Sequence, residues 1–153
     1  MTSPSSAALL VVAGPRTCAV PLAQVIETMR PQPVAPLAGC PGFVTGAAVI
    51  RGAATPVVDL RRLLGADDPA APGRFITVRV GERHAALAVD AVVGVADLDA
   101  AKVGELPPLL GGAARDVVDA IGARDGGLLV VLRAARLVPA DVWAALSAAT
   151  RSR

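Results

Sequence analysis

The stretch "IRGAATPVVDLRRLLG", residues 50–65, combines signals for a turn, a strand and a short helix. An apolar run ends at Arg51-Gly52 and a second one follows, which predicts two strands, "AAVI" and "TPVVDL", around the turn "RGAA". Asp59 is a good N-cap residue and Gly65 a good residue just after a helix, so a helix of barely two turns is expected between them. Whether Arg51 holds a substrate, a phosphate, a nucleic acid or a protein depends on the rest of the chain.

The predicted short helix is amphipathic. Leu60, Leu63 and Leu64 share one face, which we expect to be buried. Arg61 and Arg62 then lie on the opposite face, where we expect both to be exposed.

The clearest hairpin is "RFITVRVGERHAALAV", residues 74–89. Apolar and polar residues alternate from Ile76 to Val80, the period-2 pattern of a strand with one buried face. Gly81-Glu82 fits a two-residue hairpin loop with glycine at the first central position. The segment "ALLVVAGPRTCAVPL" predicts a similar hairpin with "GPR" at the turn.

The C-terminal part predicts one more hairpin and one more helix. In "AIGARDGGLLVVL", Asp125-Gly126-Gly127 separates two apolar runs. The helix is expected from Ala140 to Ala149, with Asp141 near its start and Trp143 and Leu146 at i, i+3 spacing. Segments 65–73 and 104–116 are expected to be a connector and a Pro/Gly-rich loop.

The chain contains a weak internal repeat. The Gly-x-Arg turn at Arg16 recurs at Arg83, an offset of 67 residues, and the turn at Arg51 recurs at Arg124, an offset of 73. Each half, 8–65 and 74–138, then reads as five short strands with a short helix, which suits a small barrel because closure removes sheet edges. Barrels this small have thin cores, so we predict that the two pack together around a shared one.

The composition excludes several functional classes. The 153 residues are 54% hydrophobic but only 2% aromatic, so the core must be built from small and β-branched side chains. A net charge of +2 does not indicate a binder of polyanions. Cys18 and Cys40 lack metal-ligand spacing and predict two reduced, apolar thiols. Since no apolar run approaches the ~20 residues of a spanning helix and no basic residue precedes the first run, a cytoplasmic protein is expected.

The residues give no support for catalysis. The one histidine, His84, follows a hairpin turn, and no serine or cysteine lies in a nucleophile motif. The carboxylates are scattered without metal-ligand spacing, and no glycine-rich phosphate-binding pattern occurs. We therefore predict no enzymatic activity, no metal and no cofactor.

Two binding functions stay open at this point. Small barrels often bind nucleic acids, but the aromatics Phe43, Phe75 and Trp143 are too few for stacking platforms, and no face is clearly basic. The arginines lie at separate turns (Arg16, Arg51, Arg83 and Arg124). A protein-interaction module is therefore favoured, with a nucleic-acid-binding barrel and a self-associating scaffold as the alternatives.

Four stretches resemble the CheW-type chemotaxis coupling proteins over about residues 8–146. They are "CAVPLAQVIETMRP", "PVAPLAGCPGFVTGAAVIRGAATPVVDLRRLLG", "AALAVDAVVGVADL" and "GARDGGLLVVLRAARLV". The second is the most specific, because a Pro-rich loop, Gly46, Arg51-Gly52 and the Pro-Val-x-Asp-Leu run occur in the family's order. The chain departs from the family pattern at Val49-Ile50, where Asn-Leu is usual.

This resemblance implies a mainly all-β fold of two SH3-like five-stranded β-barrels, packed around a shared core with short helices that include a C-terminal one. It implies one CheW-like domain over residues 7–149, with flexible tails at 1–6 and 150–153. The implied function is a non-enzymatic cytoplasmic adaptor, recruited to membrane-associated arrays. It would couple the cytoplasmic tip of a methyl-accepting chemoreceptor to the regulatory domain of a CheA-type histidine kinase. Other CheW-like domains are further expected partners.

The resemblance also implies roles for individual residues. Arg51 and Glu27 are expected to lie near an apolar patch, and a salt bridge between them is a hypothesis. Arg124 lies in the matching turn, but only the Arg51 side is expected to matter for coupling. The residues expected to bind receptor or kinase are Val25, Glu27, Gly46, Arg51, Gly52, Val89, Asp90 and Val92, and those of the structural signature are Pro56, Asp59 and Leu60.

Overall fold

A computed structural model describes residues 7–66, 71–97, 102–104, 118–124, 127–133 and 137–151. The first part of the chain forms β1 (Ala7–Ala13), β2 (Arg16–Pro21), the 3-10 turn η2 (Leu22–Gln24), β3 (Val25–Met29), β4 (Val44–Ile50), β5 (Ala53–Asp59) and α1 (Leu60–Leu63). The second part forms β6 (Arg74–Val80), β7 (Arg83–Val89), β8 (Ala91–Asp97), β9 (Lys102–Gly104), β10 (Val118–Arg124), β11 (Gly127–Leu132) and α3 (Ala140–Arg151).

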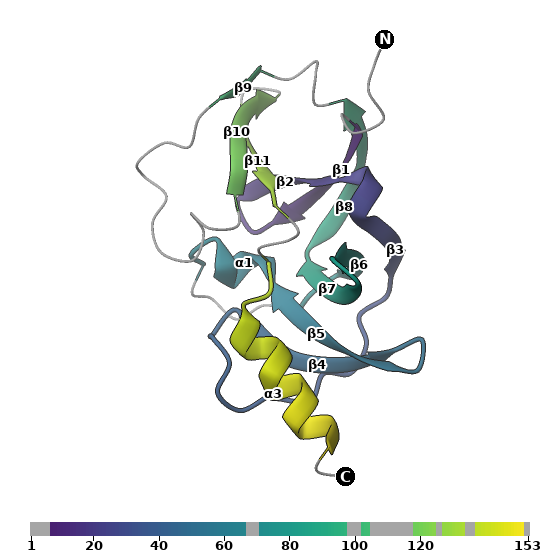
Figure 1. The fold of residues 1–153 in the computed structure, drawn as a ribbon. Coiled ribbons are helices and arrows are strands. Elements are labelled where there is room, and N and C mark those ends of the chain that lie inside the picture. Colours follow the sequence, from purple (N-terminus) through teal and green to yellow (C-terminus); the bar gives the residue numbers. More distant parts are fainter. Residues whose placement is uncertain are drawn as a thin grey trace.

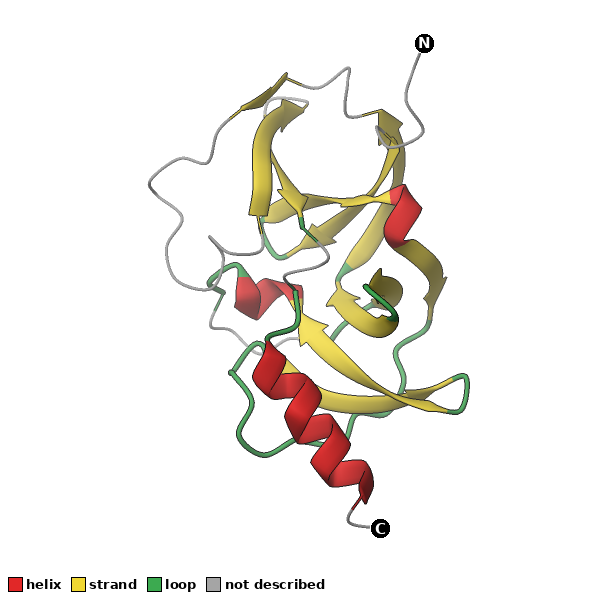
Figure 2. Cartoon of the chain, in the orientation of Figure 1, coloured by secondary structure: helices red, strands yellow, loops and turns green. Residues whose placement is uncertain are grey.

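The strands form two curved sheets, which are the two barrels of the predicted all-β fold (Figure 1). One sheet has six strands in the order β8-β1-β2-β11-β10-β9, and the other has five in the order β3-β6-β7-β5-β4. Figure 2 shows that strands make up most of the described fold and that α3, the longest described helix, lies at the end of the molecule near β4 and β5. α3 contacts β5 of the five-stranded sheet.

The internal repeat is matched by the elements, but the sheets do not follow the two halves of the sequence. The hairpin β1–β2 pairs with β8 and β11, whereas the equivalent hairpin β6–β7 pairs with β3 and β5. Each half has therefore exchanged its first hairpin with the other, and both exchanges place one parallel pair in a sheet, β2 with β11 and β7 with β5. The prediction of one barrel for each of the halves 8–65 and 74–138 is corrected accordingly.

The tight turns that the sequence predicted are present. Ala13 pairs with Arg16 and Val80 with Arg83, so each hairpin closes through a two-residue loop. The first residue of each loop has a positive φ, 61° at Gly14 and 66° at Gly81. Two-residue hairpin loops of the primed types require this backbone geometry, which glycine adopts without steric cost.

The shared core that the sequence predicted lies between the two sheets. Leu9 and Val11 of β1 join Ile76 and Val78 of β6 in one cluster, to which both sheets contribute. The next residues along β1, such as Leu10, turn the other way into a cluster within the six-stranded barrel. A strand with both faces covered needs a continuous apolar run, which explains why β1 shows little alternation.

Thr77 corrects the interpretation of β6 as a strand with one exposed face. Alternation places this residue on the solvent side, yet it is only 3% exposed. Its neighbour Phe75 is 1% exposed and fills the interior of the five-stranded barrel with Val57 and Ala88. The second face of β6 is therefore covered by its own barrel.

The short helix α1 begins as predicted, with one difference on its outer face. The carboxylate of Asp59 accepts hydrogen bonds from the backbone N–H groups of Arg61 and Arg62, at 3.0 and 3.4 Å. Leu60 and Leu63 are buried. Arg62 is exposed, but the expected exposure of Arg61 is wrong: its side chain is 16% exposed and forms an ion pair with Asp90.

The C-terminal helix extends two residues beyond its predicted end, to Arg151. Val142 is buried in the shared core, and Trp143 packs against it. The guanidinium of Arg83 lies 4.9 Å from the centre of the Trp143 ring, a cation–π contact that ties α3 to the β6–β7 hairpin.

Several predicted features lie outside the described residues. These are the tail 1–6 and the end of the other tail, part of the connector 65–73, nearly all of the loop 104–116, the Asp125-Gly126 turn and the side chain of Arg124. Within the described segments, no helix has the length and apolarity that crossing a membrane requires.

Candidate functional site

Arg51 sits at the tip of the β4–β5 hairpin in a strained backbone conformation. Ile50 pairs with Ala53, which leaves Arg51 and Gly52 as the two loop residues. Their φ angles are 53° and 79°, as a type I′ turn requires at both central positions. Glycine tolerates this region, but a residue with a Cβ pays roughly 1 kcal/mol or more. The guanidinium side chain is 78% exposed.

Arg51 forms a two-pronged ion pair with Glu27, so the predicted salt bridge is present. Nε donates to one carboxylate oxygen at 3.1 Å and Nη2 to the other at 2.8 Å. Hydrogen bonding by the guanidinium lowers the pKa of Glu27, and the carboxylate raises the pKa of Arg51. Both groups are therefore charged at neutral pH. We call this pair the clasp.

The clasp connects opposite edges of one sheet. Glu27 belongs to β3, at one edge of the five-stranded sheet, and Arg51 follows β4, at the other. A hollow of 240 Å³ lies beside the clasp, lined by Met29, Gln32 and Val49 among others. Val49 is 71% exposed, so an apolar side chain and a paired charge share this surface.

Behind the clasp, Thr77 fixes the backbone of Glu27. The ladder between β3 and β6 shifts register between Val25 and Glu27, as a β-bulge does. The Thr77 hydroxyl accepts a hydrogen bond from the Glu27 N–H at 3.2 Å and donates one to the Glu27 carbonyl at 3.3 Å. Sequence reasoning missed this residue, because a threonine in an alternating strand is normally a solvent-facing one.

Gly46 is buried inside the fold. A Cβ added there would meet the carbonyl oxygen of Ala35, and the φ of Gly46 is 148°. Ala35 is held across β4 by two hydrogen bonds with Ala47, each of 2.8 Å. Gly46 therefore lets the Pro-rich segment before β4 lie directly on the strand.

Asp90 and Val89 connect parts of the fold. One carboxylate oxygen of Asp90 accepts the N–H of Gly14 at 2.6 Å and a hydrogen bond from Arg61 at 3.1 Å. It thus joins the β1–β2 turn of one sheet to α1, which follows β5 of the other. Val89 is 1% exposed and lies in the shared core. Neither side chain is presented at the surface as Arg51 is.

Val25 and Val92 are half-buried against the shared core, and the exposed apolar side chains are their neighbours. β3 and β8 are equivalent in the repeat, and each is an edge strand of its sheet. They lie next to β6 and β1, and η2 contacts both of these strands. We define the apolar strip as the exposed residues on η2, β3 and β8: Leu22, Ile26, Val93 and Val95.

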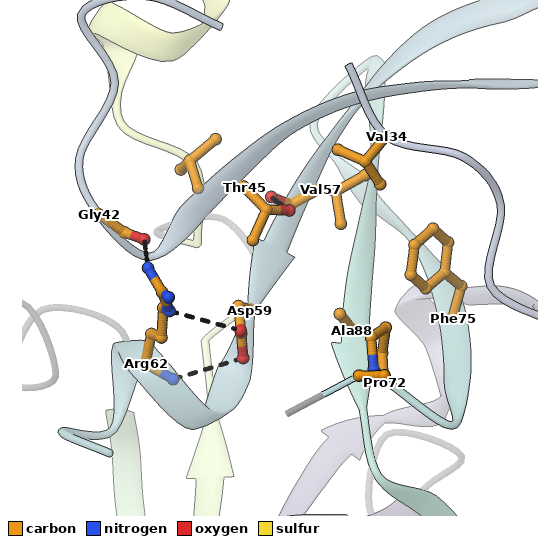
Figure 3. Close-up of a pocket in the computed structure, with 11 residues that line it drawn as sticks. Val34, Gly42, Thr45, Val57, Asp59, Arg62, Pro72, Phe75 and Ala88 are labelled. Atoms are coloured by element: carbon orange, nitrogen blue, oxygen red, sulfur yellow. Dashed lines mark hydrogen bonds and ion pairs between the residues drawn. The ribbon is translucent and has the colours of Figure 1, made fainter. Parts of the chain in front are cut away.

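A cavity of 640 Å³ lies against the five-stranded sheet (Figure 3). Val34, Val57 and Phe75 form its apolar wall. At its rim, Arg62 lies 3.9 Å from the Asp59 carboxylate and donates to the carbonyl of Gly42 at 3.4 Å. These polar groups are already paired, since Asp59 also caps α1.

The three residues assigned to the structural signature all belong to β5 and the start of α1. Pro56 and Leu60 are buried, and Asp59 is the N-cap described above. Cys18 is buried too, and burial raises the pKa of its thiol to about 12. Among the residues that the structure describes, no three His, Cys, Asp or Glu side chains gather into a potential metal site.

Comparisons with known proteins agree with this architecture. The model of the CheW-like domain family matches residues 7–142. The crystal structure of the scaffolding protein TtCheW from Thermoanaerobacter tengcongensis aligns with a TM-score of 0.70 and 21% sequence identity, over 84% of this chain and 88% of that one. No curated protein matches the sequence. Since the family model spans most of the sequence, the chain belongs to the CheW-like domain family.

Proposed function

We propose that this chain is a non-catalytic adaptor that couples the cytoplasmic tip of a chemoreceptor to the regulatory domain of a CheA-type histidine kinase. CheW-like domains are scaffold and adaptor modules of chemotaxis signalling, which gives the proposal its starting point. In this role the protein is a cytoplasmic component recruited to receptor arrays at the membrane.

The observation that carries the proposal is the position of the apolar strip. Of the five large hydrophobic side chains exposed among the described residues, four lie on η2, β3 and β8. Single exposed apolar residues are ordinary, but a group on two repeat-related edge strands suits a partner that contacts both barrels. A long receptor helix with an apolar stripe along one face is a partner of this kind.

The clasp supplies a second feature, polar and exposed, for partner recognition. An exposed ion pair contributes only about 0–1 kcal/mol to stability, so its main value is specificity. Paired charges at an interface reject partners that would leave them unpaired. Arg51, Gly52 and Glu27 are therefore assigned to coupling, with Val25 and Val92 supporting the strip from beneath.

Signal transmission in this proposal is differential binding. An adaptor can pass on the state of a receptor only if the receptor's two states bind it with different free energies. Contacts spread over the strip and the clasp let a small receptor movement change several weak interactions together.

Co-purification from native cells tests the proposal. The tagged protein should recover a histidine kinase and a long helical receptor. The double variant V93D/V95D should recover about tenfold less receptor, because charges would replace the apolar contact. The matched control is A144D, which places a charge on the exposed face of α3.

The other outcomes identify the alternatives. Recovery of the chain alone at all loadings would favour a self-associating scaffold, and recovery of RNA would favour a nucleic-acid-binding barrel. Equal losses of receptor with V93D/V95D and A144D would remove the strip from the proposal.

A further inference from the structure

Thr77 is unusual among the described residues because it is polar, buried and directed at the clasp. In the described segments, Thr55 and Thr77 are the only buried polar residues, and each is 3% exposed. Thr55 satisfies its hydroxyl within its own strand, by donating to the carbonyl of Ala53 at 3.1 Å. Thr77 instead reaches across to β3 and bonds both backbone groups of Glu27.

The two hydrogen bonds lie directly beside a β-bulge, where the ladder skips Ile26 and resumes with Glu27 opposite Thr77. A bulge interrupts the regular ladder, so a backbone N–H and a carbonyl of the bulged strand lose their usual partners. A threonine hydroxyl can accept one hydrogen bond and donate another, which is what the Glu27 backbone offers. Thr77 therefore adds two side-chain hydrogen bonds to the Glu27 backbone at the point where the ladder resumes.

Glu27 is the better-anchored half of the clasp. Its side chain is 30% exposed, whereas that of Arg51 is 78% exposed on a hairpin tip. The fork of Arg51 can engage both carboxylate oxygens only when the carboxylate is presented in the right plane. Fixing the Glu27 backbone thus fixes where Arg51 is held.

We propose that Thr77 is the positioning residue of the clasp: its hydroxyl orients Glu27 at the β3 bulge, so that Glu27 holds Arg51 in the geometry a partner recognises. The first part concerns this chain alone. The second part rests on the proposed adaptor function.

The first experiment measures the clasp without any partner. The pKa of the Glu27 carboxyl is followed by NMR titration in the wild-type protein and in T77V, T77S and T55V. T77V keeps the shape and removes the hydroxyl, so the Glu27 pKa should rise toward its ordinary value as the Arg51 hydrogen bonds are lost. T77S restores the hydroxyl and should restore the lowered pKa, and T55V should leave it unchanged.

An unchanged Glu27 pKa in folded T77V, or the same rise in T55V, would overturn the proposal. If T77V does not fold, backbone hydrogen exchange in the wild-type protein decides. The Glu27 N–H should be protected by its bond to Thr77, and exchange as fast as in an unstructured peptide would overturn the positioning role.

The second experiment measures affinity for the kinase regulatory domain. T77V should weaken binding by about three- to tenfold, the effect of losing one or two hydrogen-bonded constraints, and T77S should recover it. A raised Glu27 pKa with unchanged kinase and receptor affinity would uphold the positioning of the clasp by Thr77 and overturn its part in coupling.

Discussion

Arg51 and Glu27 join the two edge strands of the five-stranded sheet through a forked ion pair. The pair is at the surface, yet its two ends are set by the fold: a strained turn presents Arg51, and a bulge held by Thr77 presents Glu27. An exposed pair adds little to stability. Features that cost conformational energy and return little stability often serve binding.

Replacement of Arg51 separates its backbone strain from its side-chain role. R51A and R51G both remove the ion pair, and both should fold and weaken kinase or receptor binding alike. R51G should be more stable than R51A by about 1 kcal/mol, because glycine alone accepts a φ of 53° without steric cost. Urea unfolding and affinity measurements check this, with R79A, on the exposed end of β6, as the control. An unfolded R51A would show that Arg51 is mainly structural.

Substitution of Gly46 should damage the fold itself. In G46A the new Cβ would overlap the carbonyl of Ala35, and the cost should be about 2–4 kcal/mol in free energy of unfolding. Gly39 is the matched control, since it also has a positive φ of 80° but no atom within 4 Å of a new Cβ. G39A should therefore cost only about 1 kcal/mol. Equal costs in thermal or urea unfolding would contradict the close approach of Ala35.

Local features of the fold could be predicted from the sequence. Gly14 and Gly81 marked two-residue turns because few residues other than glycine adopt a positive φ, and Asp59 marked a helix start because its side chain satisfies free N–H groups. The exchange of the β1–β2 and β6–β7 hairpins could not be predicted. The two halves are similar, so a hairpin paired with its own half or with the other shows the same apolar pattern.

The candidate site was predictable only in part, because several of its contacts join strands that are far apart in sequence. The Arg51–Glu27 ion pair was a hypothesis from the sequence, and the structure contains it. The positions of Thr77, Arg61 and Asp90 depend on contacts between strands far apart in sequence. Alternation along a strand tells which residues share a face, but not whether another sheet or a helix covers that face.

Asp90 should act as a connection between the sheets. D90N keeps the size of the side chain but removes the charge that accepts both the Gly14 N–H and the Arg61 guanidinium. The free energy of unfolding should fall by about 1–3 kcal/mol, the cost of a disrupted, partly buried polar contact. D141N, in the exposed first turn of α3, should cost a few tenths, as the loss of a charge near a helix start does. Equal small effects would show that the connection contributes nothing.

The two thiols should differ in reactivity. Burial raises the pKa of Cys18 to about 12, so this side chain carries almost no thiolate at neutral pH, while Cys40 is only partly buried. A thiol reagent should therefore label one cysteine rapidly in the folded protein and two in urea. C40S should abolish the rapid reaction. Rapid labelling of folded C40S would contradict the burial of Cys18.

The clasp should also give the protein a specific response to acid. Arg51 lowers the pKa of Glu27 in the folded state relative to the unfolded chain. The stabilising contribution of the pair is therefore present above the unfolded pKa of Glu27 and is lost as the pH falls through its lower folded pKa. Comparing wild type with E27Q in urea unfolding from neutral to acidic pH isolates this contribution, because glutamine cannot titrate. The difference in stability between the two proteins should shrink as the pH falls through this range, and a difference independent of pH would contradict the ion pair.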